Sequence, residues 1–583
     1  MARFRPLLCS LVAATGTIGA LLVPGVASAA PATYVQDPAS LVNPFIGTSN
    51  FVDDFPAADT PFGMVQWGPD TPNRPDGGGY EYNDKSVTGF SLTHVSGPGC
   101  PAAGDIPILP TTGAVGTNPG AATLPLDHTK ESASAGYYSL AASGITTQLS
   151  ATTRSGMGQF TFPAGTSSNL LFKLSDGATG DSATHFQVIN NKEVTGWVTS
   201  GNFCGASDQY TLYFDMQFDQ PFTANGTWKN SQVSAGSRAM TDTATAPKTP
   251  QSPSKDTHSR TSDQTPAVHG ATPQPKGKVT PQITPPVAGA DGAYVTFDTT
   301  ANQTVQAKVG VSYVSTTNAA ANIKAENSGW NFNQVKTGAH NAWNTILNKI
   351  QVGGGSTTQQ TIFYTALYHS LLHPNVFSDS NGEYMGFDDQ VHHVANGHVQ
   401  YATYSGWDIY RSQVQLAALV APKQTSDSIT SMINDYEQSG QLPKWALNNG
   451  ESYVMVGDPA DGIIADAYAF GARNFDTKTA LQAMLAEASP SSNIRPGYNY
   501  DESMGYLPMD GTYGCCNFYG PVSTQQEYDV ADHAISTFAA ALGDKTDAAT
   551  FAARAQNWVN VFNPGSGYLE PKYLNGQFEP GFT

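Results

Sequence analysis

The order of hydrophobic and polar residues divides the chain into two parts. From Thr33 to about Ala239, short runs rich in β-branched and aromatic residues alternate with Gly, Pro and Asn, which is the pattern of closely spaced strands. After Ser315 the apolar residues recur with the spacing of amphipathic helices. Strands followed by helices are typical of an all-β domain followed by an all-α domain. We therefore expect a β-sandwich first and a helical domain after it.

The same pattern predicts individual elements. The clearest strands are expected at Ile145–Thr153, Gly158–Phe162, Leu170–Leu174, Tyr210–Phe218, Ala293–Phe297 and Thr304–Val314. Helices are expected at Ala319–Asn327, Trp330–Lys349, Thr358–Leu372, Ser405–Leu419, Asp427–Ser439, Gly462–Gly471, Asp476–Ala488, Tyr528–Leu542 and Asp547–Phe562. Many helices with long loops, and with Trp, Asp and Glu at the loop ends, indicate an α/α toroid with a central cleft.

Residues 244–286 interrupt the strand pattern. They are rich in Thr, Pro, Ser, Gln and Lys and contain no Phe, Tyr or Trp, so they predict a disordered insertion rather than a packed unit. Strand-like sequence resumes after them, so the insertion interrupts one domain. The expected fold is multidomain α and β: an antiparallel β-sandwich over 30–316, a helical linker over 317–350 and a partial (α/α)6 domain over 351–583.

Composition narrows the choice of partners. The chain has 583 residues, too many for one hydrophobic core, and 39% of them are hydrophobic, which argues against global disorder. It carries 28 Lys and Arg against 47 Asp and Glu, a formal charge of −19. An acidic chain repels phosphate backbones, so we expect no nucleic-acid partner. Neutral ligands or cations suit this composition better.

Residues 1–29 have the features of a secretory signal. Arg3 and Arg5 precede an apolar stretch from Leu7 to Val26, and small residues follow it up to Ala29. A transmembrane helix is the alternative for this stretch, but its glycines, its proline and the small-residue site after it favour cleavage. No other apolar run of 18 residues is present. We expect a secreted protein with no membrane contact after cleavage.

Four cysteines remain after such a cleavage, namely Cys100, Cys204, Cys515 and Cys516. An even number in an oxidising compartment predicts disulfides, and three pairings are possible. The sequence does not choose among them. A zinc site would need spaced Cys or His partners, which the adjacent Cys515 and Cys516 do not offer.

Several common catalytic motifs are absent from the sequence. It contains no G-x-S-x-G nucleophile elbow, no phosphate-binding G-x-x-x-x-G-K and no H-E-x-x-H zinc motif. His369 and His373 have i, i+4 spacing, but no Glu follows His369 and Pro374 follows His373. We therefore expect these histidines to pack or cap a helix rather than to bind a metal.

Carboxylates that stand close to aromatic residues are the more informative feature. The pairs are Asp70 with Trp67, Asp408 with Trp407, Glu451 with Trp445, and Glu527 with Tyr528. Aromatic rings stack on sugar C–H surfaces and carboxylates bind hydroxyls, so together the pairs favour a sugar cleft. Any one of them alone is more simply explained as a turn residue. A glycosidase needs two carboxyl groups, and the pattern does not identify which two.

A series of longer blocks resembles one family. They are Asn43–Thr48, Phe55–Ala58, Pro61–Gln66, Gly68–Thr71, Gly89–Cys100, Gly104–Asp105, Phe363–His369, Ser405–Gln413, Gly457–Ala460 and Arg554–Trp558. In this order they resemble glycoside hydrolase family 92, from about Leu41 to the C-terminus apart from the insertion.

The resemblance implies a secreted exo-α-mannosidase, α-1,2-mannosidase-like, which inverts the anomeric centre and requires Ca2+. An acidic, oxygen-rich cleft suits that ion, although the metal ligands stay unidentified. The family's general acid falls on Glu527, and its Gly-Trp-Asp block, which contacts the sugar, falls on Trp407, Asp408 and Arg411. Further substrate contacts are expected from Asp70, Glu451 and Asp458. The implied partners are mannose-containing glycans or glycoproteins, with linkage preference left open.

The sequence also departs from the family pattern. Gln525 and Gln526 replace Thr-Leu before the acid, and of a later Asp pair only Asp532 remains. The family's general-base block comes later than Thr583, so we expect a chain that holds the acid half of the site, from a fragment or a frameshifted reading. The alternative is an inactive or non-catalytic, mannose-binding secreted protein.

Overall fold

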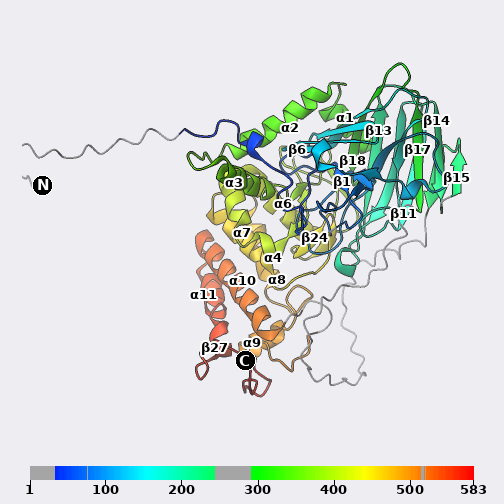
Figure 1. Cartoon of the computed structure of the whole chain (residues 1–583). Helices are drawn as coiled ribbons and strands as arrows, with labels where there is room; N and C mark the ends of the chain where they lie inside the picture. Colours follow the sequence, from blue (N-terminus) through cyan, green and yellow to red (C-terminus); the bar gives the residue numbers. More distant parts are fainter. Residues whose placement is uncertain are drawn as a thin grey trace, which may run out of the picture.

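A computed structural model describes residues 33–74, 76–230, 232–242, 290–513, 518 and 520–582. The predicted signal (1–29), the predicted insertion (244–286), Cys515 and Cys516 lie outside the described residues. Figure 1 shows a strand-rich part, which contains β14, β15 and β17, next to a helical part that ends in α10 and α11.

The strand-rich part is built from two antiparallel sheets. The first has seven strands, in the order β1 (Gly68–Asp70), β3 (Gly89–Ser91), β4 (Ile108–Thr112), β10 (Ser168–Phe172), β17 (Asp291–Phe297), β14 (Ala224–Lys229) and β15 (Gln232–Ala235). The second has nine, in the order β16 (Ala239–Asp242), β11 (Ala183–Asn190), β12 (Glu193–Ser200), β13 (Tyr210–Phe218), β18 (Thr304–Ser312), β9 (Ser155–Thr161), β8 (Ile145–Ala151), β7 (Tyr137–Ala142) and β6 (Glu131–Ser134).

The core lies between these sheets. Every residue of β10 is buried, as expected for a central strand with neighbours on both sides. Phe172 of this strand packs on Phe186 and Phe214 of the other sheet, at ring-centroid distances of 5.4 and 6.1 Å. The predicted order of a β domain followed by a helical domain is confirmed, and strand β13 has the predicted bounds.

Two helices connect the domains. Helix α1 (Thr316–Glu326) packs against β13 and β18, and α2 (Phe332–Leu347) packs against β8. Each begins after a residue whose side chain accepts a backbone N–H bond, Ser315 for α1 and Asn331 for α2.

The helical domain follows. Its helices are α3 (Thr357–His369), α4 (Gly406–Ile409), α5 (Gln413–Val420), α6 (Pro422–Ser439), α7 (Pro459–Ala469), α8 (Thr477–Glu487), α9 (Tyr498–Met504), α10 (Pro521–Leu542) and α11 (Lys545–Arg554). Short strands lie between them or after them: β19 (Asn375–Val376), β20 (Glu383–Met385), β21 (Val391–His393), β22 (Tyr401–Ala402), β23 (Tyr404–Ser405), β24 (Trp445–Leu447), β25 (Gly450–Glu451), β26 (Phe562–Asn563) and β27 (Tyr568–Leu569). A further pair, β2 (Ser86–Val87) with β5 (Leu124–Pro125), belongs to the N-terminal part.

Two helix predictions are wrong in ways that affect the site. The expected helix Ser405–Leu419 is divided into α4 and α5, because Ser412 has a φ of 141° and cannot continue a helix. Helix α10 begins at Pro521, seven residues before the expected Tyr528, so Glu527 lies inside the helix. A proline suits this first helical position, because its missing N–H would have no partner there.

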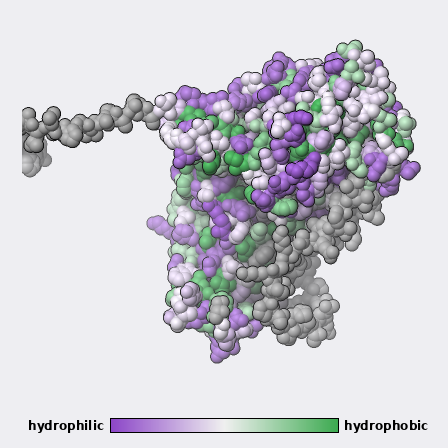
Figure 2. Space-filling model, in the orientation of Figure 1, coloured by the Kyte–Doolittle hydropathy of each residue, from purple (hydrophilic) through white to green (hydrophobic). Residues whose placement is uncertain are grey.

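A disulfide within the sandwich lies next to a ring stack that joins the two domains. Cys100 and Cys204 are bonded, and Phe203 stacks on Trp445 of β24. Hydrophobic residues are visible among hydrophilic ones on both parts of the face drawn in Figure 2. Within the described residues, no helix is long and apolar enough to cross a membrane.

Candidate active site

Glu527 of α10 lies in a cradle of hydrogen-bond donors. The indole Nε1 of Trp407 and Nη2 of Arg411 donate to its Oε1 at 3.1 and 2.5 Å, and the Tyr410 hydroxyl donates to its Oε2 at 2.6 Å. The Glu527 side chain keeps 15% of its surface exposed. The structure thus brings together Glu527, Trp407 and Arg411, as predicted from the resemblance, and adds Tyr410.

The short helix α4 positions these donors. Strand β23 pairs with β24, and a side chain on Gly406 would collide with the backbone carbonyl of Lys444, so the chain can turn here only with glycine. Arg411 Nε donates to the Trp407 carbonyl at 2.9 Å, and its guanidinium lies 4.5 Å from the Trp407 ring centroid. This cation–π contact orients Arg411, whose side chain is 44% exposed, toward Glu527.

The backbone before α7 packs against the Glu527 side chain. Gly457 has a φ of +83°, a conformation that favours glycine, and a Cβ there would lie 2.7 Å from the Cβ of Glu527. The main chain therefore approaches the Glu527 side chain as closely as a glycine permits.

Asp458 occupies a different position from the predicted substrate contact. It is buried and accepts a 2.7 Å bond from Nε of Arg495. Arg495 also donates to Asp532 at 2.8 Å, and its guanidinium lies 4.9 Å from the ring centroid of Tyr528. Asp458 therefore ties α7 to α10 beneath Glu527 through a buried arginine. Sequence reasoning missed Arg495, which stands in a Ser- and Pro-containing loop with no local motif.

Glu451 is engaged by its own hairpin. Its carboxylate accepts backbone N–H bonds from Lys444, Trp445 and Tyr453 at 2.6, 3.2 and 2.6 Å. Burial raises the pKa of Glu451 although these donors oppose the change. Burial also lowers the pKa of the nearby Lys444 ammonium to about 8. Glu451 stabilises the β24–β25 turn through these bonds.

Asp70 is completely buried in the β-sandwich. It accepts a hydrogen bond from Ser91 and pairs with Arg74 and His94 at 3.5 and 3.4 Å. Burial alone would raise its pKa, but Arg74 and the hydrogen bonds hold that pKa below its usual value. Asp70 thus stabilises the sandwich core.

Asp408 remains accessible. It is exposed in the first turn of α4 and accepts a hydrogen bond from the Ser405 hydroxyl. Both roles considered from the sequence, a sugar contact and stabilisation of a helix N-terminus, are compatible with this position.

The two histidines pack as expected. His369 lies 3.4 Å from Asp54, and Nε2 of His373 accepts the backbone N–H of Ser96 at 3.3 Å. Burial lowers the pKa of His373 to about 4, so its imidazole is neutral near pH 7.

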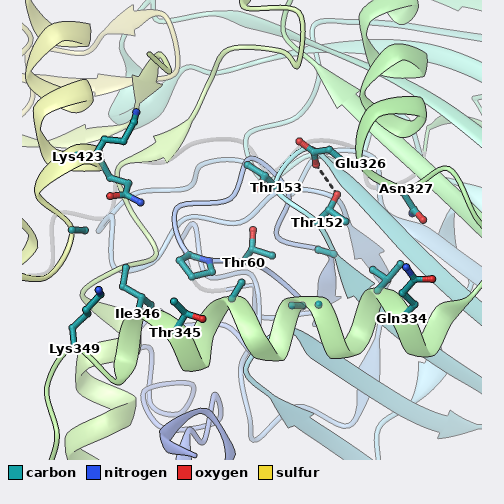
Figure 3. Close-up of a pocket in the computed structure, with 18 of the residues that line it drawn as sticks. Thr60, Thr152, Thr153, Glu326, Asn327, Gln334, Thr345, Ile346, Lys349 and Lys423 are labelled. Carbon is teal, nitrogen blue, oxygen red and sulfur yellow. Dashed lines mark hydrogen bonds between the residues drawn. The ribbon is translucent and has the colours of Figure 1, made fainter. Parts of the chain in front are cut away.

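A separate cavity of about 980 Å³ lies between α2, the loops at Thr60 and Thr152, and the start of α6. Figure 3 shows Thr60 and Thr152 above the α2 ribbon, with Lys349 and Lys423 to one side and the Glu326–Thr152 hydrogen bond marked. None of the predicted site residues lines this cavity.

Two models of one protein family match this chain. The glycosyl hydrolase family 92 N-terminal domain matches residues 41–312, and the family 92 catalytic domain matches residues 318–583. A curated relative, an uncharacterized secreted glycosidase of Arthroderma benhamiae, is 24% identical over 94% of this chain and 66% of its own length.

Solved structures are similar over the same part of the chain. A family GH92 α-mannosidase from Bacteroides thetaiotaomicron superposes with a TM-score of 0.79 at 26% identity, covering 94% of this chain and 68% of that protein. A GH92 inverting mannosidase from the same species gives 0.78 at 24% identity, with the same coverage. The chain spans about two thirds of the length of these relatives.

Fold and site together define a two-domain glycoside hydrolase, in which a β-sandwich precedes a helical catalytic domain. The chain belongs to glycosyl hydrolase family 92.

Proposed function

We propose that the protein hydrolyses terminal α-linked mannose from glycans, as an α-1,2-mannosidase-like, inverting enzyme. The observation that carries this proposal is Glu527, a partly exposed carboxyl group held by Trp407, Tyr410 and Arg411. Family membership supports it, as does a 26%-identical GH92 α-mannosidase whose structure is also known in complex with mannoimidazole.

In the proposed mechanism Glu527 acts as the general acid. It transfers a proton to the glycosidic oxygen while the bond to the anomeric carbon breaks, and a second carboxylate activates a water on the opposite face of the sugar. Trp407 and Arg411 fix the carboxyl group, and the exposed Asp408 is available to bind sugar hydroxyls. No residue of this chain is assigned as the general base.

Calcium dependence is part of the proposal and rests on the resemblance. Among the residues that the structure describes, no three His, Cys, Asp or Glu side chains are placed to hold a metal ion. The described side chains therefore do not form a calcium cage by themselves, and we derive no catalytic step through the ion.

Secretion and the choice of partners follow from the same reasoning. The fungal relative is named as a secreted glycosidase, and the N-terminal 29 residues have the pattern of a secretory signal. We propose mannose-containing glycans or glycoproteins as partners. The formal charge of −19 disfavours nucleic acid.

The proposed function is tested by the first product of the reaction. The full chain is incubated with α-1,2-mannobiose, with Ca2+ and after treatment with a chelator, and ¹H NMR follows the anomeric signals. Inversion predicts β-mannose first, only with Ca2+, and product formation roughly 10²–10⁴-fold slower with Glu527→Gln. Mannose binding without turnover would instead favour the non-catalytic glycan-binding protein.

A further inference from the structure

The two oxygens of Glu527 have chemically different surroundings. Oε1 accepts from the Trp407 indole and from the Arg411 guanidinium. Both of these groups can only donate hydrogen bonds. A proton on Oε1 would therefore face two N–H groups and find no acceptor.

Oε2 has a partner of another kind. It bonds to the Tyr410 hydroxyl at 2.6 Å, and a hydroxyl can donate or accept. When Glu527 is ionised, Tyr410 donates to Oε2; when Glu527 is protonated, the hydroxyl can rotate and accept from Oε2. Oε2 can therefore keep its hydrogen bond to Tyr410 whether Glu527 is ionised or protonated.

Tyr410 is itself held in place. Its ring packs over Gly462 of α7, where a Cβ would lie 3.4 Å from the ring, and the Arg411 guanidinium lies 4.8 Å from its centroid on another side. Burial, followed by the bond to Glu527, raises the pKa of the Tyr410 hydroxyl, so it keeps its proton near neutral pH.

We propose that Tyr410 is a positioning residue that directs the acidic proton of Glu527 to Oε2 and so selects the oxygen that protonates the leaving group. This inference rests on the proposed function and deepens it. Tyr410 acts through Glu527, without direct contact with the substrate. The proton transfer is the one already proposed for Glu527. The Oε2–H bond breaks, a bond from that proton to the glycosidic oxygen forms, and Glu527 is left ionised.

The first test compares two ligands in calorimetry of the full chain. In mannoimidazole a ring nitrogen stands where the glycosidic oxygen would be and accepts a hydrogen bond from the acid, whereas 1,5-anhydromannitol has neither this nitrogen nor an anomeric oxygen. We expect Tyr410→Phe to weaken mannoimidazole binding about tenfold or more and to leave 1,5-anhydromannitol binding within about twofold. Tyr436→Phe, a partly buried tyrosine of α6, is the matched control and should change neither. Equal weakening of both ligands by Tyr410→Phe would show a packing role and overturn the proposal.

A second measurement needs no ligand. In protein labelled with ¹⁵N-tryptophan, eight indole signals are expected, and Trp407→Phe identifies the one that reports on Glu527. This signal should shift with pH in the wild type and stay constant in Glu527→Gln. Tyr410→Phe removes the partner of Oε2, so the proton is no longer held on that oxygen and the low-pH position of the indole signal should differ from that of the wild type; identical low-pH positions overturn the proposal whatever the ligand data. If the wild type binds neither ligand, the proposed function fails while this measurement still decides the role of Tyr410.

Discussion

Phe203 of the β-sandwich stacks on Trp445 of the helical domain, with ring centroids 4.0 Å apart and planes 20° from parallel. Both side chains are buried. Trp445 lies in β24, which pairs with β23, and β23 ends two residues before Trp407. The sandwich therefore contacts the strand that pairs with the segment leading into the donors of Glu527.

Removing this stack should reduce both stability and ligand binding. Phe203→Ala deletes a buried ring, a change that costs about 3–5 kcal/mol in protein cores. Urea unfolding should show this loss. Mannoimidazole binding should also weaken, because β24 loses its contact with the sandwich. Phe218→Ala, at a buried phenylalanine of β13 whose ring packs on Phe222 and Phe297 of the sandwich, is the control. If it weakens binding as much as Phe203→Ala does, the stack has no special relation to the site.

Gly457 should be irreplaceable for a steric reason in addition to its backbone conformation. Gly457→Ala incurs strain at positive φ, about 1–3 kcal/mol, and displaces the Glu527 side chain. Gly440, at the C-terminus of α6, has a φ of +80° and nothing within 4 Å of its hypothetical Cβ. Gly440→Ala is thus a matched control for backbone strain. Both variants should lower the melting temperature, and only Gly457→Ala should weaken mannoimidazole binding; equal binding by the two variants would contradict the close contact.

Asp408 offers a test of the sugar-contact role. Asp408→Asn keeps the size of the side chain but removes its charge. If this exposed residue binds sugar hydroxyls, mannose affinity should fall while the melting temperature stays nearly unchanged. A clear drop in melting temperature with normal mannose affinity would assign Asp408 to the N-terminus of α4 instead.

His373 should make stability depend on pH. The folded protein holds this imidazole neutral, with a pKa lowered from 6.5 to about 4, whereas the unfolded chain takes up a proton below pH 6.5. The unfolded state then binds more protons, so stability should fall as the pH drops from 6.5 to 4, by about 3 kcal/mol. His373→Gln keeps an acceptor for the Ser96 N–H and should flatten this dependence. Identical pH profiles of unfolding for variant and wild type would refute the assignment.

Much of the fold could be predicted from residue pattern. Short β-prone runs between turn residues predicted the strands, and β13 was predicted to the residue, because a strand with neighbours on both sides has a strong local signal. The break between α4 and α5 could not be predicted. It depends on the backbone at Ser412 and on the contact between Gly406 and Lys444, which are 38 residues apart.

The site was predictable only in part. The resemblance assigned Glu527, Trp407 and Arg411 to one site, and the structure places their side chains in contact, while their roles stay predictions. The carboxylate–aromatic pairs were chosen because the two residues are close in the sequence. Closeness in sequence does not determine which way a side chain points. Asp458 pairs with Arg495, 37 residues later, a contact without a local signature, and Glu451 accepts backbone N–H bonds within its own hairpin, which the pattern of residue types does not show.

The measurement that tests the central claim most directly compares two leaving groups in Glu527→Gln. General acid catalysis contributes roughly 10²–10⁴-fold to rate, and a dinitrophenyl leaving group needs little protonation. If Glu527 is the acid, the variant should lose about that factor on α-1,2-mannobiose and far less on 2,4-dinitrophenyl α-mannoside, relative to the wild type. Equal losses of kcat/KM on both substrates would contradict the role of Glu527 as the general acid.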